Sequence, residues 1–185
     1  MMKRFYTLLL LIIFVCGSVN AQYVVGTSQP ERDAWGNIKT THRDSRGNIT
    51  GISTTEVDAW GDIKTTHRDS RGNILGTSTA NIDAWNKARV THKDEYGNII
   101  SISTRDTDPW GKPRTTYRDR YGNLLSTSTL GTDPWGRHKI TYKDSRGNIT
   151  GYSITEIDAW GKPKTTHKSD DPTTSIWFWE YDIMF

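Results

Sequence analysis

The stretch DAWGDIKTTHRDSRGNILGTSTANI, residues 58–82, contains the pattern D-x-x-G twice, at 58–61 and at 69–72. In each copy the aspartate can accept hydrogen bonds from the backbone of the turn, and the glycine tolerates a left-handed conformation. Both features are typical of a type I turn closed by a left-handed residue, a common connection in β-hairpins. The stretch therefore predicts two chain reversals in 25 residues.

The same stretch recurs along nearly the whole chain of 185 residues. Tryptophan stands at positions 35, 60, 85, 110, 135 and 160, and a Gly-Asn pair begins at 47, 72, 97, 122 and 147. The spacing is 25 residues without slippage, from Val24 to about Lys168. Self-similarity at a fixed period of this length indicates a repeat protein.

Between the turns lie segments of 7 and then 10 residues, such as 62–68 and 73–82. They are rich in Thr, Ile and Val, which favours antiparallel strands. Because the lengths differ, we expect an overhang or a bulge in the longer strand, for which Gly51, Gly76 and Gly151 are candidates. The predicted fold class is all-β: an antiparallel β-hairpin repeat array of eleven or twelve strands. So wide a sheet seldom stays open without curling, so we expect a meander coiled into a twisted ribbon, a solenoid or a spiral shell.

The first 21 residues have the layout of a secretory signal peptide. Lys3 and Arg4 precede an apolar run, and small residues lead to a predicted cleavage site after Ala21. A lipoprotein signal at Cys16 is a weaker alternative. Cleavage would remove the single cysteine and lower Lys+Arg from 24 to 22 against 21 Asp+Glu, a net charge of about +1. We therefore expect a disulfide-free protein that is secreted, periplasmic or at the cell surface, and nucleic acid is not an expected partner.

One unit resembles a known repeat family. Residues 108–129, DPWGKPRTTYRDRYGNLLSTST, are similar to the YD repeats of RHS-type proteins. The residues that fall on the YD-repeat pattern are Asp108, Pro109, Gly111, Tyr117, Asp119, Gly122, Asn123 and Leu124. The period is longer than in YD repeats, Arg118 replaces the tyrosine before the aspartate, and histidine replaces the first tyrosine in other units. The resemblance implies a bacterial exported β-repeat protein that forms a shell, surface or adhesive element.

The tryptophans are the first candidate ligand-binding residues. Trp35, Trp60, Trp85, Trp110, Trp135 and Trp160 all occupy the third position of a D-x-W-G turn, with Asn86 in place of the glycine after Trp85. In a meander these turns share one edge, with a step of two strands, roughly 9.5 Å, close to the advance of a disaccharide in an extended glycan. Two interpretations remain open: a stacking platform for sugars, or rings folded over the sheet to supply missing apolar area.

A basic face is the second candidate. Positive side chains alternate with threonine along each short strand, so stacked repeats would form two basic rows. The row nearer the D-x-x-G-N turn, a candidate site for an anionic polymer, contains Arg43, Arg68, Lys93, Arg118 and Lys143. The alternative is a solvated face whose charges pair with Glu56, Asp106 or Glu156 on neighbouring strands.

The opposite face of the short strands presents a third periodic set, namely His42, His67, His92, Tyr117, Tyr142 and His167. An aromatic ladder across the strands is the favoured interpretation, and a metal site shared between repeats is the alternative. A catalytic site is a single asymmetric constellation, whereas every candidate here recurs, so we expect neither an enzyme nor a cofactor.

The last segment, 169–185, breaks the repeat that we assign to 22–168. In SIWFWEYDIMF, residues 175–185, apolar residues alternate from Trp177 to Phe185, which favours a capping strand for the array. An assembly or attachment signal is the alternative. Together these features predict an exported, non-enzymatic binding module for an extended polymer, either polysaccharide or polyanion. A purely structural or adhesive surface protein is the second hypothesis, with self-association through the tail.

Overall fold

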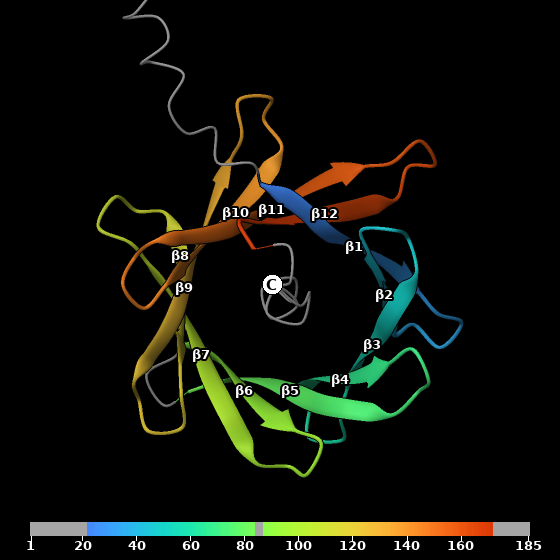
Figure 1. Ribbon diagram of the computed structural model, residues 1–185. Helices are drawn as coiled ribbons and strands as arrows, with labels where there is room; N and C mark the ends of the chain where they lie inside the picture. The colour runs from blue at the N-terminus through green and yellow to red at the C-terminus, as the bar shows by residue number, and fades with distance from the viewer. Residues whose placement is uncertain (1–21, 84–86, 172–185) are drawn as a thin grey trace, which may run out of the picture.

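The computed structural model describes residues 22–83 and 87–171, which form twelve antiparallel strands. No helix occurs in these two ranges, and none is therefore available to cross a membrane there. Figure 1 shows the strands arranged in a ring. Their bounds are β1 Tyr23–Arg32, β2 Ile38–Asp44, β3 Ile49–Val57, β4 Ile63–Asp69, β5 Ile74–Ile82, β6 Ala88–Asp94, β7 Ile99–Thr107, β8 Pro113–Arg118, β9 Leu124–Thr132, β10 His138–Asp144, β11 Ile149–Ile157 and β12 Pro163–Ser169.

The all-β antiparallel meander is confirmed, but the strands close into a barrel, so the predicted open array, solenoid or spiral shell is wrong. Each strand pairs with its sequence neighbours, and β1 pairs with β12. The described chain begins with a strand of the long type and ends with one of the short type. Consequently His167 lies opposite Gly26, as His42 lies opposite Gly51 inside the chain. The two edges match like any internal pair, and closure leaves no unpaired edge.

The predicted turn chemistry is present at both ends of the barrel. At the 44–48 turn, the amide of Gly47 donates to the carbonyl of Asp44 over 3.0 Å, and the amide of Asp44 donates to the carbonyl of Asn48 over 2.9 Å. Gly47 has a φ of 87°, a conformation that a side chain would strain. The Asn48 amide donates to the Asp44 carboxylate and, as the largest cause, lowers the pKa of that aspartate. Each hairpin is thus held by its own residues.

Of the two alternatives left open by the sequence, an overhang or a bulge, the structure shows a bulge in the longer strand. In the β2–β3 pair, His42 faces Gly51 and Arg43 faces Ile49, so Thr50 is the extra residue. The same shift recurs where β4 meets β5. At Gly76 a Cβ atom would overlap the carbonyl oxygen of Lys93 on β6, so the bulge glycine is required by a close approach of two backbones.

The interior of the barrel is polar. Among the described residues, five hydrophobic side chains are buried against 17 polar or charged ones. Serine and histidine form one layer, and threonine pairs form the next. Thr55 and Thr65 are 2.8 Å apart through their hydroxyls, and Thr155 and Thr165 are 2.9 Å apart. Because so little apolar area is buried, hydrogen bonds between neighbouring strands take a large part in fixing the register.

Candidate functional site

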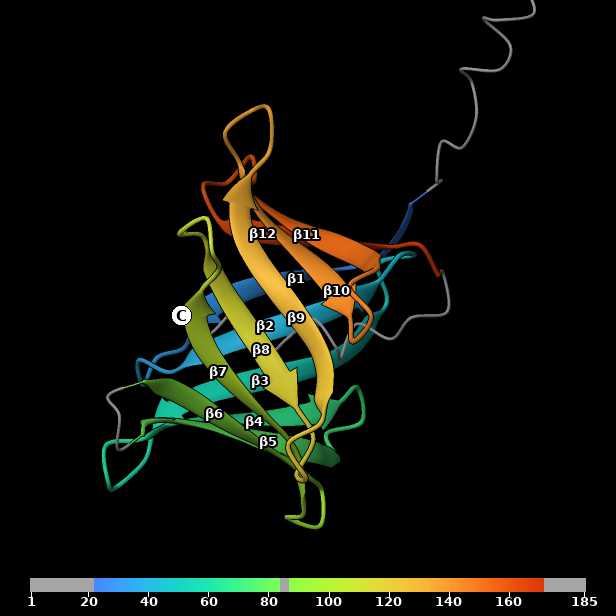
Figure 2. The ribbon, with the colours of Figure 1, turned by 90° about the vertical axis from the view of Figure 1, so that its left-hand side faces the viewer.

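All the D-x-W-G turns lie at one end of the barrel, because every second turn of a meander falls on the same side. The hairpins project from both ends of the barrel in Figure 2. We call the following residues the tryptophan rim: Trp35, Trp60, Trp110, Trp135 and Trp160. Their side chains are 77–87% exposed, so the interpretation that the rings fold over the sheet is wrong for them. Trp85 lies outside the described residues.

Each ring of the rim stands on a rigid turn. The amide of Trp110 donates to Oδ1 of Asp108 over 2.9 Å, and the amide of Lys112 donates to the same oxygen over 2.8 Å. The arrangement recurs at the other described rim turns, and at Trp135 the guanidinium of Arg137 lies 5.3 Å from the ring centroid. The rim therefore presents apolar rings, with cations beside them, on backbone that is already ordered.

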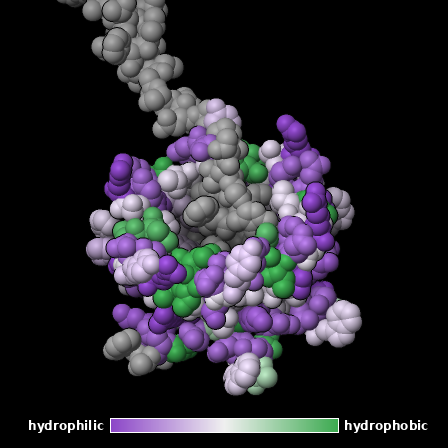
Figure 3. Space-filling model, turned by 60° about the horizontal axis from the view of Figure 1, so that its bottom comes forward, coloured by the Kyte–Doolittle hydropathy of each residue, from purple (hydrophilic) through white to green (hydrophobic). Residues whose placement is uncertain are grey.

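A hollow of about 400 Å³ lies beside two of these turns. Most of its lining residues face outward from β9 and β10, and Lys112 and Lys139 supply positive charge. The lining comprises Lys112, Thr129, Leu130, Gly131, Thr132, Lys139 and Thr141. The face shown in Figure 3 is mostly hydrophilic, and its hydrophobic patches are separate from one another.

The predicted basic row lies at the opposite end of the barrel from the tryptophan rim. Arg43 is the second-last residue of β2, next to the 44–48 turn, and its guanidinium donates to the carbonyl of Gly47 over 2.9 Å. Arg68 and Arg118 make the same contact with their own turns. The structure therefore does not bring this basic row and the tryptophans into one site. Each of these arginines instead stabilises the turn of its own hairpin. In the row nearer the rim, Arg114 pairs with Asp106 over 2.8 Å, as the solvated-face interpretation expected.

Inside the barrel, the periodic histidines form a hydrogen-bonded chain with serines. Ser28, Ser53, Ser78 and Ser153 each contact a histidine or tyrosine on both sides, and Ser103 contacts His92, over 2.7–3.1 Å. We call this set the Ser–His chain, in spatial order Tyr142, Ser153, His167, Ser28, His42, Ser53, His67, Ser78, His92 and Ser103. It follows the wall from β10 through the β12–β1 closure to β7.

The Ser–His chain has a consequence for histidine tautomers. Each neutral imidazole has one N–H and each serine one O–H, while both ring nitrogens of every histidine in the chain face a serine. A serine cannot donate to two neighbours at once. If the imidazoles are neutral and every bond is kept, the donors therefore point one way along the chain, with at most one reversal at a serine that accepts from both sides. The histidines are coupled as a set.

Burial keeps at least one of these histidines neutral. His92 is fully buried, and desolvation, followed by the positive charge that His67 can acquire, lowers the pKa of His92 to about 3. Its ring lies 6.4 Å from that of Tyr117. The periodic rings of the predicted ladder do share one interior face, and serines from the intervening long strands stand between the histidine rings and bond to them.

The alternative of a metal site can be examined at the same positions. Within residues 22–83 and 87–171, no three His, Cys, Asp or Glu side chains are placed to hold a metal ion together. The histidine nitrogens are instead engaged by serine hydroxyls. Those hydroxyls are nearly inaccessible, with Ser78 0% and Ser153 2% exposed, so the Ser–His pairs serve as structure and not as exposed nucleophiles.

The serines were missed in the sequence, although a signal was present. Serine recurs every 25 residues, at 28, 53, 78, 103, 128 and 153, with no exception. The alternation of side chains along a strand places these serines on the same face as the bulge glycines. That spacing could have paired them with the histidines.

Comparison with known proteins adds no assignment. No protein-family model matches the chain, and no curated protein matches it.

Proposed function

We propose that this protein acts outside the cytoplasm as a non-enzymatic binding module for an extended polymer, and that the tryptophan rim is its contact surface. The observation that supports this most strongly is the exposure of the rings, 87% at Trp35 and Trp60. A soluble protein rarely displays large apolar side chains repeatedly at one end unless they meet a partner. The ligand class that suits them is a sugar polymer with acidic groups.

The charges near the rim support an acidic polymer over a neutral one. Lys112 and Lys139 line the hollow beside the Trp110 and Trp135 turns, and Arg137 lies against the Trp135 ring. Sugar rings present C–H faces that stack on indole, and carboxylate or sulfate groups would pair with the adjacent cations. Both contacts are available within one hairpin and its neighbour.

Closure of the barrel sets how a polymer could bind. Neighbouring rim turns are two strands apart, roughly 10 Å, but they follow an arc instead of a straight line. A chain that touches several turns must bend along the rim. Each contact is weak, and later contacts are effectively intramolecular, so affinity should rise with polymer length until the arc is filled.

Closure also changes the experiment. Removing repeats would separate β1 from β12 and open the barrel, so side-chain substitution is the cleaner test. We would titrate the protein by calorimetry with acidic oligosaccharides of increasing length, using wild type, Trp60→Ala and Trp110→Ala. Each substitution should weaken binding about 2- to 12-fold, the range of a single aromatic contact of about 0.5–1.5 kcal/mol.

Tyr121→Ala is the matched control, because Tyr121 is 75% exposed at the third position of a turn on the opposite end. It should leave affinity unchanged. Equal losses from Tyr121→Ala and Trp110→Ala would show nonspecific adhesion and contradict the assignment of the rim. A second hypothesis, a structural or adhesive surface element, predicts no saturable binding to any polymer in the series.

A further inference from the structure

The repeat is regular along the chain, yet its exceptions gather on one side of the barrel interior. In the layer above the Ser–His chain, β11–β12 and β3–β4 face inward with the threonine pairs described above. Between β5 and β10 the corresponding pairs are Ala80–Val90, Arg105–Thr115 and Leu130–Ile140. The sixth pair of the layer, between β1 and β2, is Pro30–Thr40. The side of the layer from β5 to β10 is therefore mostly apolar and holds one guanidinium, whereas the other side carries most of the threonine hydroxyls.

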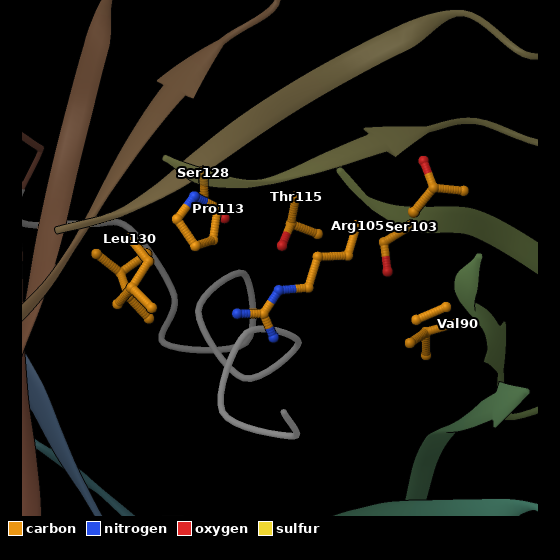
Figure 4. Close-up of a pocket in the computed structure, with 10 residues that line it drawn as sticks. Val90, Ser103, Arg105, Pro113, Thr115, Ser128 and Leu130 are labelled. Carbon is orange, nitrogen blue, oxygen red and sulfur yellow. The ribbon is translucent and has the colours of Figure 1, made fainter. Parts of the chain in front are cut away.

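Arg105 is the centre of this apolar half. The same position in other repeats holds Pro30, Thr55, Ala80, Leu130 and Thr155, so no other repeat has a charged residue here and the fold does not demand one. Its side chain points into the barrel, beside Ser103 of the same strand and Thr115 of the adjacent β8 (Figure 4). No acidic side chain in the described parts of the chain forms a salt bridge with it.

The guanidinium lies at a cavity of about 70 Å³. Apolar groups from both neighbouring pairs line it, together with hydroxyls: Val90, Leu130, Ile140, Pro113, Ser103 and Thr115. One water occupies about 10–15 Å³ on such a measure, so the cavity accommodates a ligand of roughly five non-hydrogen atoms. A planar guanidinium binds a carboxylate with two parallel hydrogen bonds. The flanking apolar pairs suit a short hydrocarbon group attached to that carboxylate.

We propose that the barrel interior contains a binding site for a short-chain carboxylate, in which Arg105 binds the carboxylate and Val90, Leu130 and Ile140 contact its hydrocarbon group. The site is separate from the tryptophan rim, and the evidence for it does not depend on polymer binding. Its ligand chemistry is a carboxylate next to apolar carbon. That group can come from a free acid or from an acidic side chain in 172–185, where Glu180 and Asp182 lie outside the described residues.

The test is calorimetric titration of the full chain with butyrate, acetate and the neutral isostere butyramide. Wild type should bind butyrate saturably, and acetate and butyramide at least tenfold more weakly. Arg105→Thr places in β7 the residue that other repeats have at this position, so the barrel should still fold, and butyrate affinity should fall at least tenfold. Arg71→Gln, on an exposed turn, is the control and should bind as wild type.

Leu130→Thr separates the two halves of the site. It should weaken butyrate binding about tenfold while changing acetate binding less than twofold, because only the hydrocarbon contact is lost. Saturable butyrate binding with the same affinity in wild type and Arg105→Thr would overturn the proposal. If butyrate binds only to the Glu180→Gln, Asp182→Asn variant, the carboxylate is supplied by the chain itself and the site is supported. Absence of binding in both backgrounds would overturn it.

Discussion

The buried His92 should lower the free energy of unfolding of the barrel at acidic pH, and one substitution should remove this effect. His92 has a pKa of about 3 in the folded protein, against 6.5 when solvated. Between these values the unfolded chain takes up a proton that the folded chain does not, so the free energy of unfolding falls as the pH falls. The stabilising contribution is complete above pH 6.5 and lost as the pH approaches 3.

The size of the effect follows from the two pKa values. Integrating proton uptake gives a loss of about 2 kcal/mol between pH 7 and pH 5, and about 3 kcal/mol between pH 7 and pH 4, from this one residue. The other groups that face His92 are His67, Tyr117 and the hydroxyls of Ser78 and Ser103. Turn aspartates titrate at lower pH, since hydrogen bonds from asparagine, the largest cause, lower the pKa of Asp69 and Asp94.

His92→Tyr is the variant that isolates the titration. Tyrosine stands at the equivalent position in two later repeats, and Tyr142 keeps the hydroxyl contact with its serine, 3.1 Å to Ser153. We would measure urea unfolding of wild type and His92→Tyr from pH 7 to pH 4, with exposed His138→Gln as control. The difference in unfolding free energy between wild type and His92→Tyr should change by about 3 kcal/mol across this range. Parallel pH profiles for the two proteins would refute the reasoning.

Three further outcomes are expected. Gly76→Ala should destabilise the barrel by about 1–3 kcal/mol in urea unfolding, because its Cβ would overlap the Lys93 carbonyl, whereas Gly131→Ala, with open space around it, should change stability by less than about 0.5 kcal/mol. Imidazole nitrogen NMR should find the histidines of the Ser–His chain in one shared tautomer, or in two blocks with one junction, and an alternating pattern would contradict the hydrogen-bond argument. If the tail acts as a cap, deletion of 176–185 should promote aggregation while circular dichroism stays β-rich; a truncated protein that remains monomeric and equally stable would favour the attachment signal.

Local features of this fold were accessible from the sequence because each is decided within a few residues. The D-x-x-G turns, the strand segments and the bulge at Gly51 all follow from backbone preferences and side-chain spacing. The alternation of faces also placed His42 opposite the basic residues correctly. The exposure of Trp35 was not decidable in this way, because an indole at a turn can either fold over the sheet or project from it.

The site inside the barrel was inaccessible for a different reason. Arg105 and Leu130 occupy the same repeat position, 25 residues apart, and each differs from the residues that the other repeats have there. In an open array they would be two members of a long row of dissimilar side chains. Only the curvature of the sheet turns their faces toward a common interior. In the closed barrel these departures gather into one apolar sector with a cation (Figure 4).

Closure of the barrel depends on whether the first and last strands can pair with each other, which the regular repeat does not reveal. A chain of complete hairpins would also begin with one strand type and end with the other, so matching edges are necessary for closure but not sufficient. The number of strands must also match the curvature of the sheet. Ser28 of β1 can pair with Thr165 of β12 only if twelve strands together complete one full turn around the barrel axis. The Ser–His chain supplies a check on that turn, since Ser28 bonds to His42 within the meander and to His167 across the closure, over 2.8 and 2.9 Å. The bond across the closure is as short as the internal one, so closing the barrel extends the repeating contact without distorting it.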